Sequence, residues 1–184
     1  LHGESFAWHY VREPRMGYWQ IEIFGITANG VKLDFCDDGT CRGILDTGTA
    51  LLTVPRRIGS KLMDLLRFAN EQGKPCDADV PALLIDLGNI TVELTPSDIG
   101  RPEVIDGFDD VEKLATTGAG EAQHCLPMLM YADFQEPLSR KTFILGEPVL
   151  QKYYAAFDMD YSEPRIGMAL AKHTVQRDPL RVRR

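Results

Sequence analysis

The spacing of apolar residues is the feature that most restricts the fold of this 184-residue chain. Apolar and polar residues alternate over residues 18–26 and 31–35, and the Asn29-Gly30 pair between them is typical of a two-residue hairpin turn. Residues 56–70 carry the clearest helical pattern, and Pro148 predicts a second, short helix. Further strands are predicted at 43–46, 51–54, 83–87, 90–94, 125–131, 142–145, 153–158 and 165–171. We expect a mainly β domain with one main helix and short helices, and a long loop over 96–122 that contains a short helix at 109–114.

The composition excludes two classes of protein. The net charge is −7, and basic side chains concentrate after residue 171, so the body of the chain is acidic and poorly suited to binding nucleic acid. The longest apolar run, residues 125–132, is far shorter than the ~18 residues that span a bilayer. Because the sequence has no established spacing of metal ligands or nucleotide-binding glycines, we expect no metal and no organic cofactor. The chain begins at Leu1, without an initiator Met, and we therefore expect a fragment or a processed product.

Four cysteines point to disulfide bonds. Cys36 and Cys41 flank an Asp-Gly turn, where a hairpin would bring their sulfur atoms within bonding distance. Cys76 and Cys125 would then close a loop of about 50 residues, although four cysteines allow three pairings. The alternative is a zinc site that uses cysteines with His124, but it lacks a close pair of ligands. Disulfides and a glycosylation sequon at Asn89 together favour the secretory pathway.

Residues 43–55 hold the candidate for catalysis. Asp46 ends an apolar run and is followed at once by Thr47, Gly48 and Thr49. Burial raises the pKa of a carboxyl group, whereas hydrogen-bond donors aimed at it lower that pKa, so such a setting can tune one acid for chemistry. Gly48 lets the backbone turn closely around the carboxyl group, and the two threonines add hydroxyl groups. The simpler alternative is an aspartate at a strand end that forms an ordinary Asx turn.

The longer sequence of residues 44–55, ILDTGTALLTVP, resembles the second active-site loop of the pepsin-like aspartic proteases. Residues 17–21 resemble the strand that precedes this loop, and the two cysteine pairs follow in the family's order. Residues 143–158 and 165–169 resemble the family's closing strands and short helix. The resemblance covers about residues 16–171 and implies the C-terminal lobe of the bilobal pepsin-like fold. We expect residues 1–15 to lead in from an N-terminal lobe outside this chain, and residues 172–184 to form a flexible basic tail.

The resemblance also implies roles for residues around the loop. Asp46 looks like the catalytic aspartate of this lobe. Gly48 and Thr49 resemble residues that line the substrate cleft, and the Thr49 hydroxyl resembles the group that supports the outer carboxylate oxygen. Ile44 resembles a residue that faces a substrate side-chain pocket. These positions are the expected catalytic and substrate-binding site.

Other positions resemble residues that support the active loop. Thr47 resembles the residue whose hydroxyl contacts the opposite loop across the lobe interface. The segment of Ile144, Leu145 and Gly146 resembles the one that passes beneath the active loop and holds it. Ala50 replaces the more usual serine, and we expect this change to remove one hydrogen bond without abolishing chemistry.

The expected function is that of an aspartic endopeptidase, which hydrolyses peptide bonds next to apolar residues at acid pH. The chemistry needs two aspartates that share a proton, and pepsin is the standard example. Because this sequence has one Asp-Thr-Gly, the expected partners are a peptide substrate and the N-terminal lobe of the same protein, and we expect the chain alone to be inactive. The alternatives are a non-catalytic peptide-binding module and a homodimeric protease in which two copies of Asp46 meet. We expect the protein outside the cell or in an acidic vacuole- or lysosome-like compartment.

Overall fold

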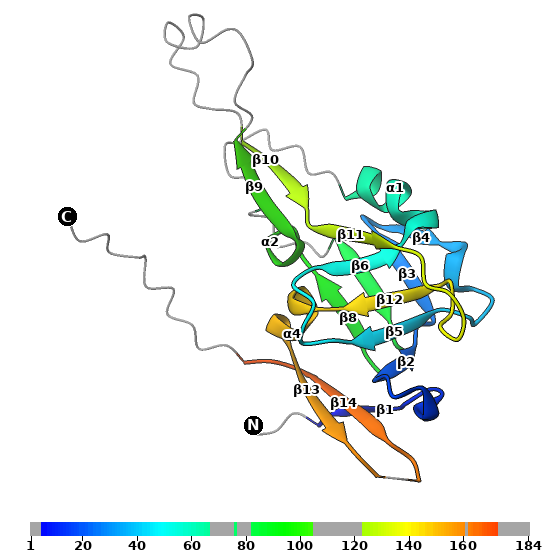
Figure 1. Ribbon diagram of the computed structural model, residues 1–184. Coiled ribbons are helices and arrows are strands. Elements are labelled where there is room, and N and C mark those ends of the chain that lie inside the picture. Colours follow the sequence, from blue (N-terminus) through cyan, green and yellow to red (C-terminus); the bar gives the residue numbers. More distant parts are fainter. Residues whose placement is uncertain (1–4, 67–75, 77–81, 105–122, 161, 173–184) are drawn as a thin grey trace, which may run out of the picture.

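A computed structural model describes residues 5–66, 76, 82–104, 123–160 and 162–172 (Figure 1). The described part is mainly β, as predicted, with few and short helices. None of its helices has the length and apolar character needed to cross a membrane. Its strands form four sheets, and the candidate site lies on the one with five strands.

A five-stranded sheet carries the candidate site. Its order is β11-β6-β12-β5-β2. The strands are β2 (Gln20–Glu22), β5 (Arg42–Leu45), β6 (Leu52–Pro55), β11 (Leu129–Ala132) and β12 (Thr142–Leu145). β5 and β6 follow each other in the chain, yet β12 lies between them, parallel to β5 and antiparallel to β6. The loop from β5 to β6 therefore has to pass over the end of β12.

A four-stranded antiparallel sheet of order β4-β3-β7-β8 lies behind the five-stranded sheet in the view of Figure 1. It contains β3 (Gly25–Ala28), β4 (Val31–Leu33), β7 (Leu83–Asp86) and β8 (Thr91–Leu94). Asn29 and Gly30 between β3 and β4 have φ values of 47° and 78°, the positive values that the predicted type I′ turn requires. The predicted hairpin around Gly88 is also confirmed, because β7 pairs with β8.

A three-stranded antiparallel sheet brings the two ends of the described chain together. β1 (Ala7–Tyr10) pairs with β14 (Arg165–Leu170), which pairs with β13 (Tyr153–Asp158). β1 is not predicted from the sequence, because a four-residue strand carries little periodic signal. The interval expected to lead in from another lobe thus contains a strand that pairs over its whole length with β14.

Two strand predictions are corrected by the structure. Residues 18–26 are divided between β2 and β3. The chain changes sheets between Ile23 and Phe24. The Ile23 N–H donates to the carbonyl of Cys41, next to β5 of the five-stranded sheet, and the Phe24 N–H donates to the carbonyl of Asp86 in β7 of the four-stranded sheet. Residues 125–131 are divided between β10 (Gln123–Pro127) and β11 at Met128, whose N–H bonds to the carbonyl of Ile99. In both cases the strand changes partners, which an apolar pattern does not reveal.

The segment expected as a long loop begins with regular structure. α2 (Pro96–Ile99) has a capping box, in which Thr95 and Asp98 bond to each other's backbone N–H. β9 (Gly100–Val104) then pairs with β10. The loop prediction is therefore wrong for residues 96–104. Residues 105–122, including the short helix expected at 109–114, lie outside the described residues.

The remaining helices are short. α1 (Arg56–Leu65) covers the described part of the main predicted helix. Gly59 of α1 lies against the ring of Tyr131, where a Cβ atom would come within 2.4 Å of the ring. α4 (Glu147–Lys152) contains Pro148 in its first turn, as expected. Two 3-10 turns, η1 (Pro14–Met16) and η2 (Asp34–Cys36), complete the described elements. The predicted tail beyond residue 172 lies outside the described residues.

One core joins the sheets. Side chains from the five-stranded and four-stranded sheets, the inner face of the three-stranded sheet and α1 pack into a single buried cluster. Its largest fully buried members include Ile21, Ile23, Ile26, Leu33, Leu52, Leu62, Leu83, Ile85, Leu94 and Phe143. Burying such side chains is the main stabilising term of the fold, at about 1.5–3 kcal/mol for each large one.

Candidate active site

Asp46 lies immediately after β5, where the chain leaves the five-stranded sheet. Its Oδ1 atom accepts a hydrogen bond of 2.9 Å from the backbone N–H of Gly48. Its Oδ2 atom accepts a hydrogen bond of 2.6 Å from the hydroxyl of Thr49. The two oxygens of the carboxylate are thus held by two different donors, and both donors come from the next three residues of the chain.

The bond to Gly48 is that of an Asx turn, so the simpler alternative from the sequence is part of the site. Asp86 forms the same bond to the N–H of Gly88, at 2.8 Å. Asp38 and Asp160 form similar turns, but in each a single oxygen accepts both of the local bonds. Asp46 differs because each of its oxygens has its own donor within the next three residues, whereas the second oxygen of Asp38 is bound by the distant Lys141. Two such local bonds fix the plane of the Asp46 carboxyl group.

The electrostatics of Asp46 favour its charged form. The hydroxyl of Thr49, and after it the N–H of Gly48, lower the pKa of the carboxyl group below its ordinary value, and the slight burial of the group opposes them. Donors that bond to a carboxylate stabilise the anion more than the neutral acid. In this chain the donors therefore outweigh burial.

The loop that carries Asp46 rests on the start of α4. The N–H of Asp46 bonds to the carbonyl of Leu145 at 3.3 Å, and the N–H of Glu147 bonds to the carbonyl of Thr49 at 2.8 Å. Between them, Gly146 lies so close to the loop that a Cβ atom would be 2.2 Å from the Thr49 oxygen and 2.6 Å from the Leu51 oxygen. Only glycine fits there without moving the loop.

The structure places the other expected residues unequally. Thr47 and Gly48 are exposed at the tip of the loop. The Thr47 side chain has no hydrogen-bond partner among the described residues, so its hydroxyl is free to bond to another surface. Ile44 and Ile144 are neighbours across the parallel pair of β5 and β12. Both residues are buried, with 5% and 9% of their surface exposed to solvent. Ile44 therefore presents little surface to a ligand within this chain.

Two contacts at the site were missed by sequence reasoning. The N–H of Leu45 bonds to the carbonyl of Trp19 at 3.0 Å, which ties the residue before Asp46 to the residue that immediately precedes β2. Gly43 packs closely against the side chain of Leu145: a Cβ atom added to Gly43 would lie 3.0 Å from the Leu145 Cδ1 atom. An apolar run followed by Asp-Thr-Gly signals the loop itself, but no local pattern signals which distant strand packs against it.

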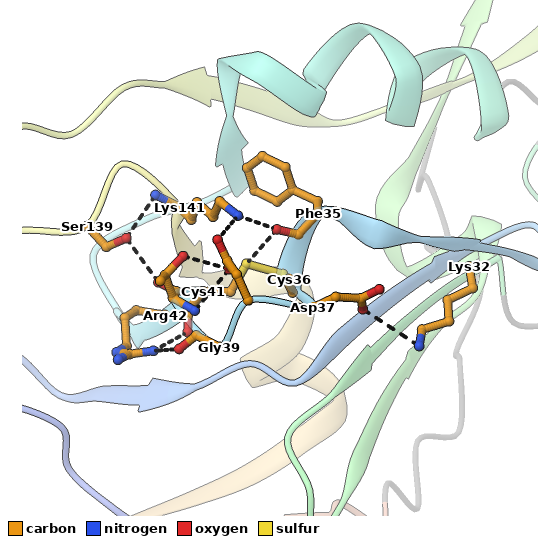
Figure 2. The surroundings of a disulfide bond; sticks show 11 residues. Lys32, Phe35, Cys36, Asp37, Gly39, Cys41, Arg42, Ser139 and Lys141 are labelled. Carbon is orange, nitrogen blue, oxygen red and sulfur yellow. Dashed lines mark hydrogen bonds and ion pairs between the residues drawn. A yellow bond between two sulfur atoms is a disulfide. The ribbon is translucent and has the colours of Figure 1, made fainter.

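The predicted disulfide between Cys36 and Cys41 is present, with a Cα–Cα distance of 5.3 Å (Figure 2). The predicted hairpin is not, because the flanking strands belong to different sheets: β4 pairs with β3, and β5 pairs with β2 and β12. Lys141 braces the turn that the disulfide closes, because its Nζ atom donates to the Phe35 carbonyl and to Asp38, each at 2.6 Å. Lys141 immediately precedes β12, so this contact links the turn to the strand beneath the active loop. Cys76 is also disulfide-bonded. Its pairing with Cys125, whose side chain lies outside the described residues, stays a prediction.

Comparison with known proteins shows the family of this chain. A family model described as eukaryotic aspartyl protease matches residues 2–171. Gastricsin of Cavia porcellus is 31% identical over 160 residues, which are 84% of this chain and 35% of that protein. Cathepsin D of Homo sapiens is 30% identical over 169 residues, which are 88% of this chain and 36% of that protein. Pepsin A-5 of Mus musculus is 28% identical over 176 residues, 92% of this chain and 39% of that protein.

The chain thus spans little more than a third of the length of the curated relatives it matches. The matched region includes the Asp46 loop, the disulfide-bonded turn of residues 36–41 and the closing strands β13 and β14. The chain belongs to the eukaryotic aspartyl protease family.

Proposed function

We propose that this chain supplies one of the two catalytic aspartates of an aspartic endopeptidase, and that Asp46 is that residue. The observation that carries the proposal is the pair of donors on Asp46, one for each carboxylate oxygen. A catalytic carboxyl group has to be held in a fixed plane and has to remain accessible, and a loop held by Gly146 from below meets both needs.

The proposed reaction uses the proton that the two aspartates share. Asp46, whose charged form the Thr49 and Gly48 donors favour, accepts a proton from water as that water attacks the peptide carbonyl carbon. The second aspartate gives its proton to the carbonyl oxygen. Collapse of the resulting tetrahedral intermediate breaks the C–N bond, and the amine leaves with a proton from the pair. Because the two carboxyl groups are coupled, their pKa values belong to the pair rather than to either residue.

The second aspartate is proposed to come from an N-terminal lobe of the same protein. The length of the curated relatives supports this, because they extend well beyond the matched region. The free hydroxyl of Thr47 at the exposed tip of the loop supplies a donor for the opposing loop. Peptides with apolar residues at the cleavage site are the proposed substrates, and acid pH is the proposed working range.

The secretory pathway is the proposed location, outside the cell or in an acidic compartment. The Cys36–Cys41 disulfide and the bonded state of Cys76 support an oxidising environment during folding.

Substitution of Asp46 in the full-length protein tests the catalytic proposal. Asp46→Asn is expected to lower kcat for an apolar peptide by roughly 10³-fold or more, while the fold is retained. Asp86→Asn is the matched control, because Asp86 forms the same Asx turn at a hairpin, and this variant is expected to keep full activity. Pepstatin is expected to inhibit the unsubstituted protein. Undiminished activity of Asp46→Asn would overturn the assignment.

The source of the second aspartate is tested with the 184-residue chain on its own. It is expected to sediment as a monomer and to cleave no peptide. If instead it dimerises and cleaves peptides, the second carboxyl group comes from another copy of Asp46. If the full-length protein binds peptides with no Asp46-dependent cleavage, the chain belongs to a binding module.

A further inference from the structure

We propose that Asn89 carries an N-linked oligosaccharide, and that the first sugar packs into a groove between the β7–β8 turn and β1. Residues 89–91 have the sequence Asn-Ile-Thr, which the N-glycosylation machinery recognises. Asn89 and Thr91 are both exposed at the turn. The folded protein therefore leaves room for a bulky modification at this position.

The turn directs the Asn89 side chain toward β1. Its backbone is fixed by the bond from the Leu87 N–H to the Ile90 carbonyl at 3.0 Å, and by Gly88, whose φ is +87°. The Asn89 Nδ2 atom then donates to the backbone carbonyl of Trp8, at 3.1 Å. A side-chain amide has two hydrogens on Nδ2. One hydrogen remains on Nδ2 after the sugar is attached, so the glycosylated amide still has a donor for the Trp8 carbonyl.

Asn89 lines a groove beside β1 and β14. Its volume is about 710 Å³, and it is lined by Phe6, Trp8, Ile90 and Leu170 in addition to Asn89. The Trp8 side chain is 38% exposed and that of Leu170 is 50% exposed, so the groove has an apolar wall open to solvent. The apolar C–H face of an acetamido sugar packs well on aromatic and aliphatic surface, while its hydroxyl groups stay in water.

The modification itself uses a lipid-linked oligosaccharide diphosphate as donor, in the secretory pathway. The C1–Nδ2 bond forms, the bond from sugar C1 to the phosphate oxygen breaks, and the lipid diphosphate leaves. The displaced amide hydrogen is lost as a proton, so no oxidant or reductant is needed. Transfer occurs before the chain has folded, and the folded turn then sets where the sugar lies.

The proposal rests on the secretory location proposed above and is independent of the role of Asp46. The redox state of the cysteines distinguishes failure of the glycosylation proposal from failure of the secretory location. If Cys36 and Cys41 form a disulfide in the isolated protein and Asn89 is unmodified, the glycosylation proposal is overturned alone. If these cysteines are reduced in the protein purified from its native cells, the secretory location fails, and the glycosylation proposal fails with it.

The site is tested in the full-length protein, secreted from a eukaryotic host. Mass spectrometry of the peptide that contains Asn89 is expected to show a hexose and N-acetylhexosamine adduct. Enzymatic removal of the glycan in heavy-oxygen water is expected to leave a labelled aspartate at that position. Thr91→Ala is expected to abolish the adduct, whereas Thr91→Ser keeps the sequon and is expected to retain it. An adduct that persists in Thr91→Ala would contradict the assignment.

The packing of the first sugar against the Trp8 side chain is tested separately. Glycans on Thr91→Ser protein are trimmed to one sugar, and this protein is compared with unglycosylated Thr91→Ala protein. The single sugar is expected to raise the Tm by about 2–4 °C, which corresponds to one added contact in a domain of this size. It is also expected to slow the chemical oxidation of the Trp8 indole, followed by mass spectrometry of its peptide. Equal oxidation rates in the two proteins would show that the sugar does not occupy the groove.

Discussion

Gly146 lies directly beneath the carbonyl oxygen of Thr49, and a Cβ atom on residue 146 would be 2.2 Å from that oxygen. Thr49 is also the residue whose hydroxyl bonds to Asp46. The position of the Asp46 carboxyl group therefore depends on a backbone approach that tolerates only glycine.

Gly146→Ala is expected to lower the free energy of unfolding by about 1–3 kcal/mol or more, because the added methyl group overlaps backbone atoms that have no space to move into. Activity in the full-length protein is expected to fall as well, since the loop has to shift. Urea unfolding and peptide hydrolysis measure the two effects. Gly25→Ala is the control, because an added Cβ there meets only Asp86, at an ordinary 3.8 Å. Equal stability of the two variants would show that the loop adapts.

Thr49→Val is expected to raise the pKa of Asp46, because it removes the donor that contributes most to lowering it. The acid limb of the pH–rate profile of the full-length protein is expected to move to higher pH. Thr49→Ser keeps the hydroxyl and should restore the original profile. A profile unchanged in Thr49→Val would mean that the hydroxyl does not control the titration.

His9 is expected to make the fold less stable in acid. This residue of β1 is buried, its Nε2 atom has no hydrogen-bond partner among the described residues, and burial lowers its pKa from the ordinary 6.5. Below about pH 6.5 the His9 side chain is therefore protonated in the unfolded chain but stays neutral in the folded chain. Protonation thus favours the unfolded chain, and the free energy of unfolding decreases as the pH falls. Unfolding of the wild type and of His9→Leu between about pH 7.5 and 5 measures the effect. The variant is expected to show a smaller loss across this range.

Lys141→Met is expected to raise the pKa of Asp38 from about 2 toward its ordinary value, because the bond from the Lys141 ammonium group is the largest cause of the low pKa. Because the pKa of Asp38 is lower in the folded chain than in the unfolded chain, its bond to Lys141 stabilises the fold above the ordinary pKa of 3.8. This stabilisation is lost as the pH falls through about 2. Carboxyl NMR titration measures the shift. Lys32 of β4 lies 3.7 Å from Asp37, the neighbour of Asp38, and gives the control Lys32→Met, which should leave the pKa of Asp38 unchanged.

Local signals in the sequence were sufficient for hairpins and for the nearer disulfide. The Asn29-Gly30 turn, the Gly88 turn and the Cys36–Cys41 pair each lie within a few residues of the chain, where turn chemistry decides the structure. The class of fold follows from the same period-2 pattern.

Contacts between distant segments were not predictable from these patterns. The pairing of Trp8 with Gly167 in the β1–β14 ladder and the position of β12 between β5 and β6 join residues roughly a hundred or more positions apart. Periodicity gives the exposed and buried faces of a strand, but not its neighbour or its direction. At the site, the donors on Asp46 come from adjacent residues, whereas the support from Leu145 and Gly146 was expected only from a family resemblance.

The place of β12 between β5 and β6 has a consequence for biosynthesis. During translation, the Asp46 loop leaves the ribosome long before residues 142–147 do. Until these residues emerge, the loop lacks the strand and backbone contacts that support it in the folded protein. Because non-local and parallel pairing is slow to form, this part of the sheet is expected to close late. The order of synthesis would thus keep the aspartate out of its final position until residues 142–147 have been translated.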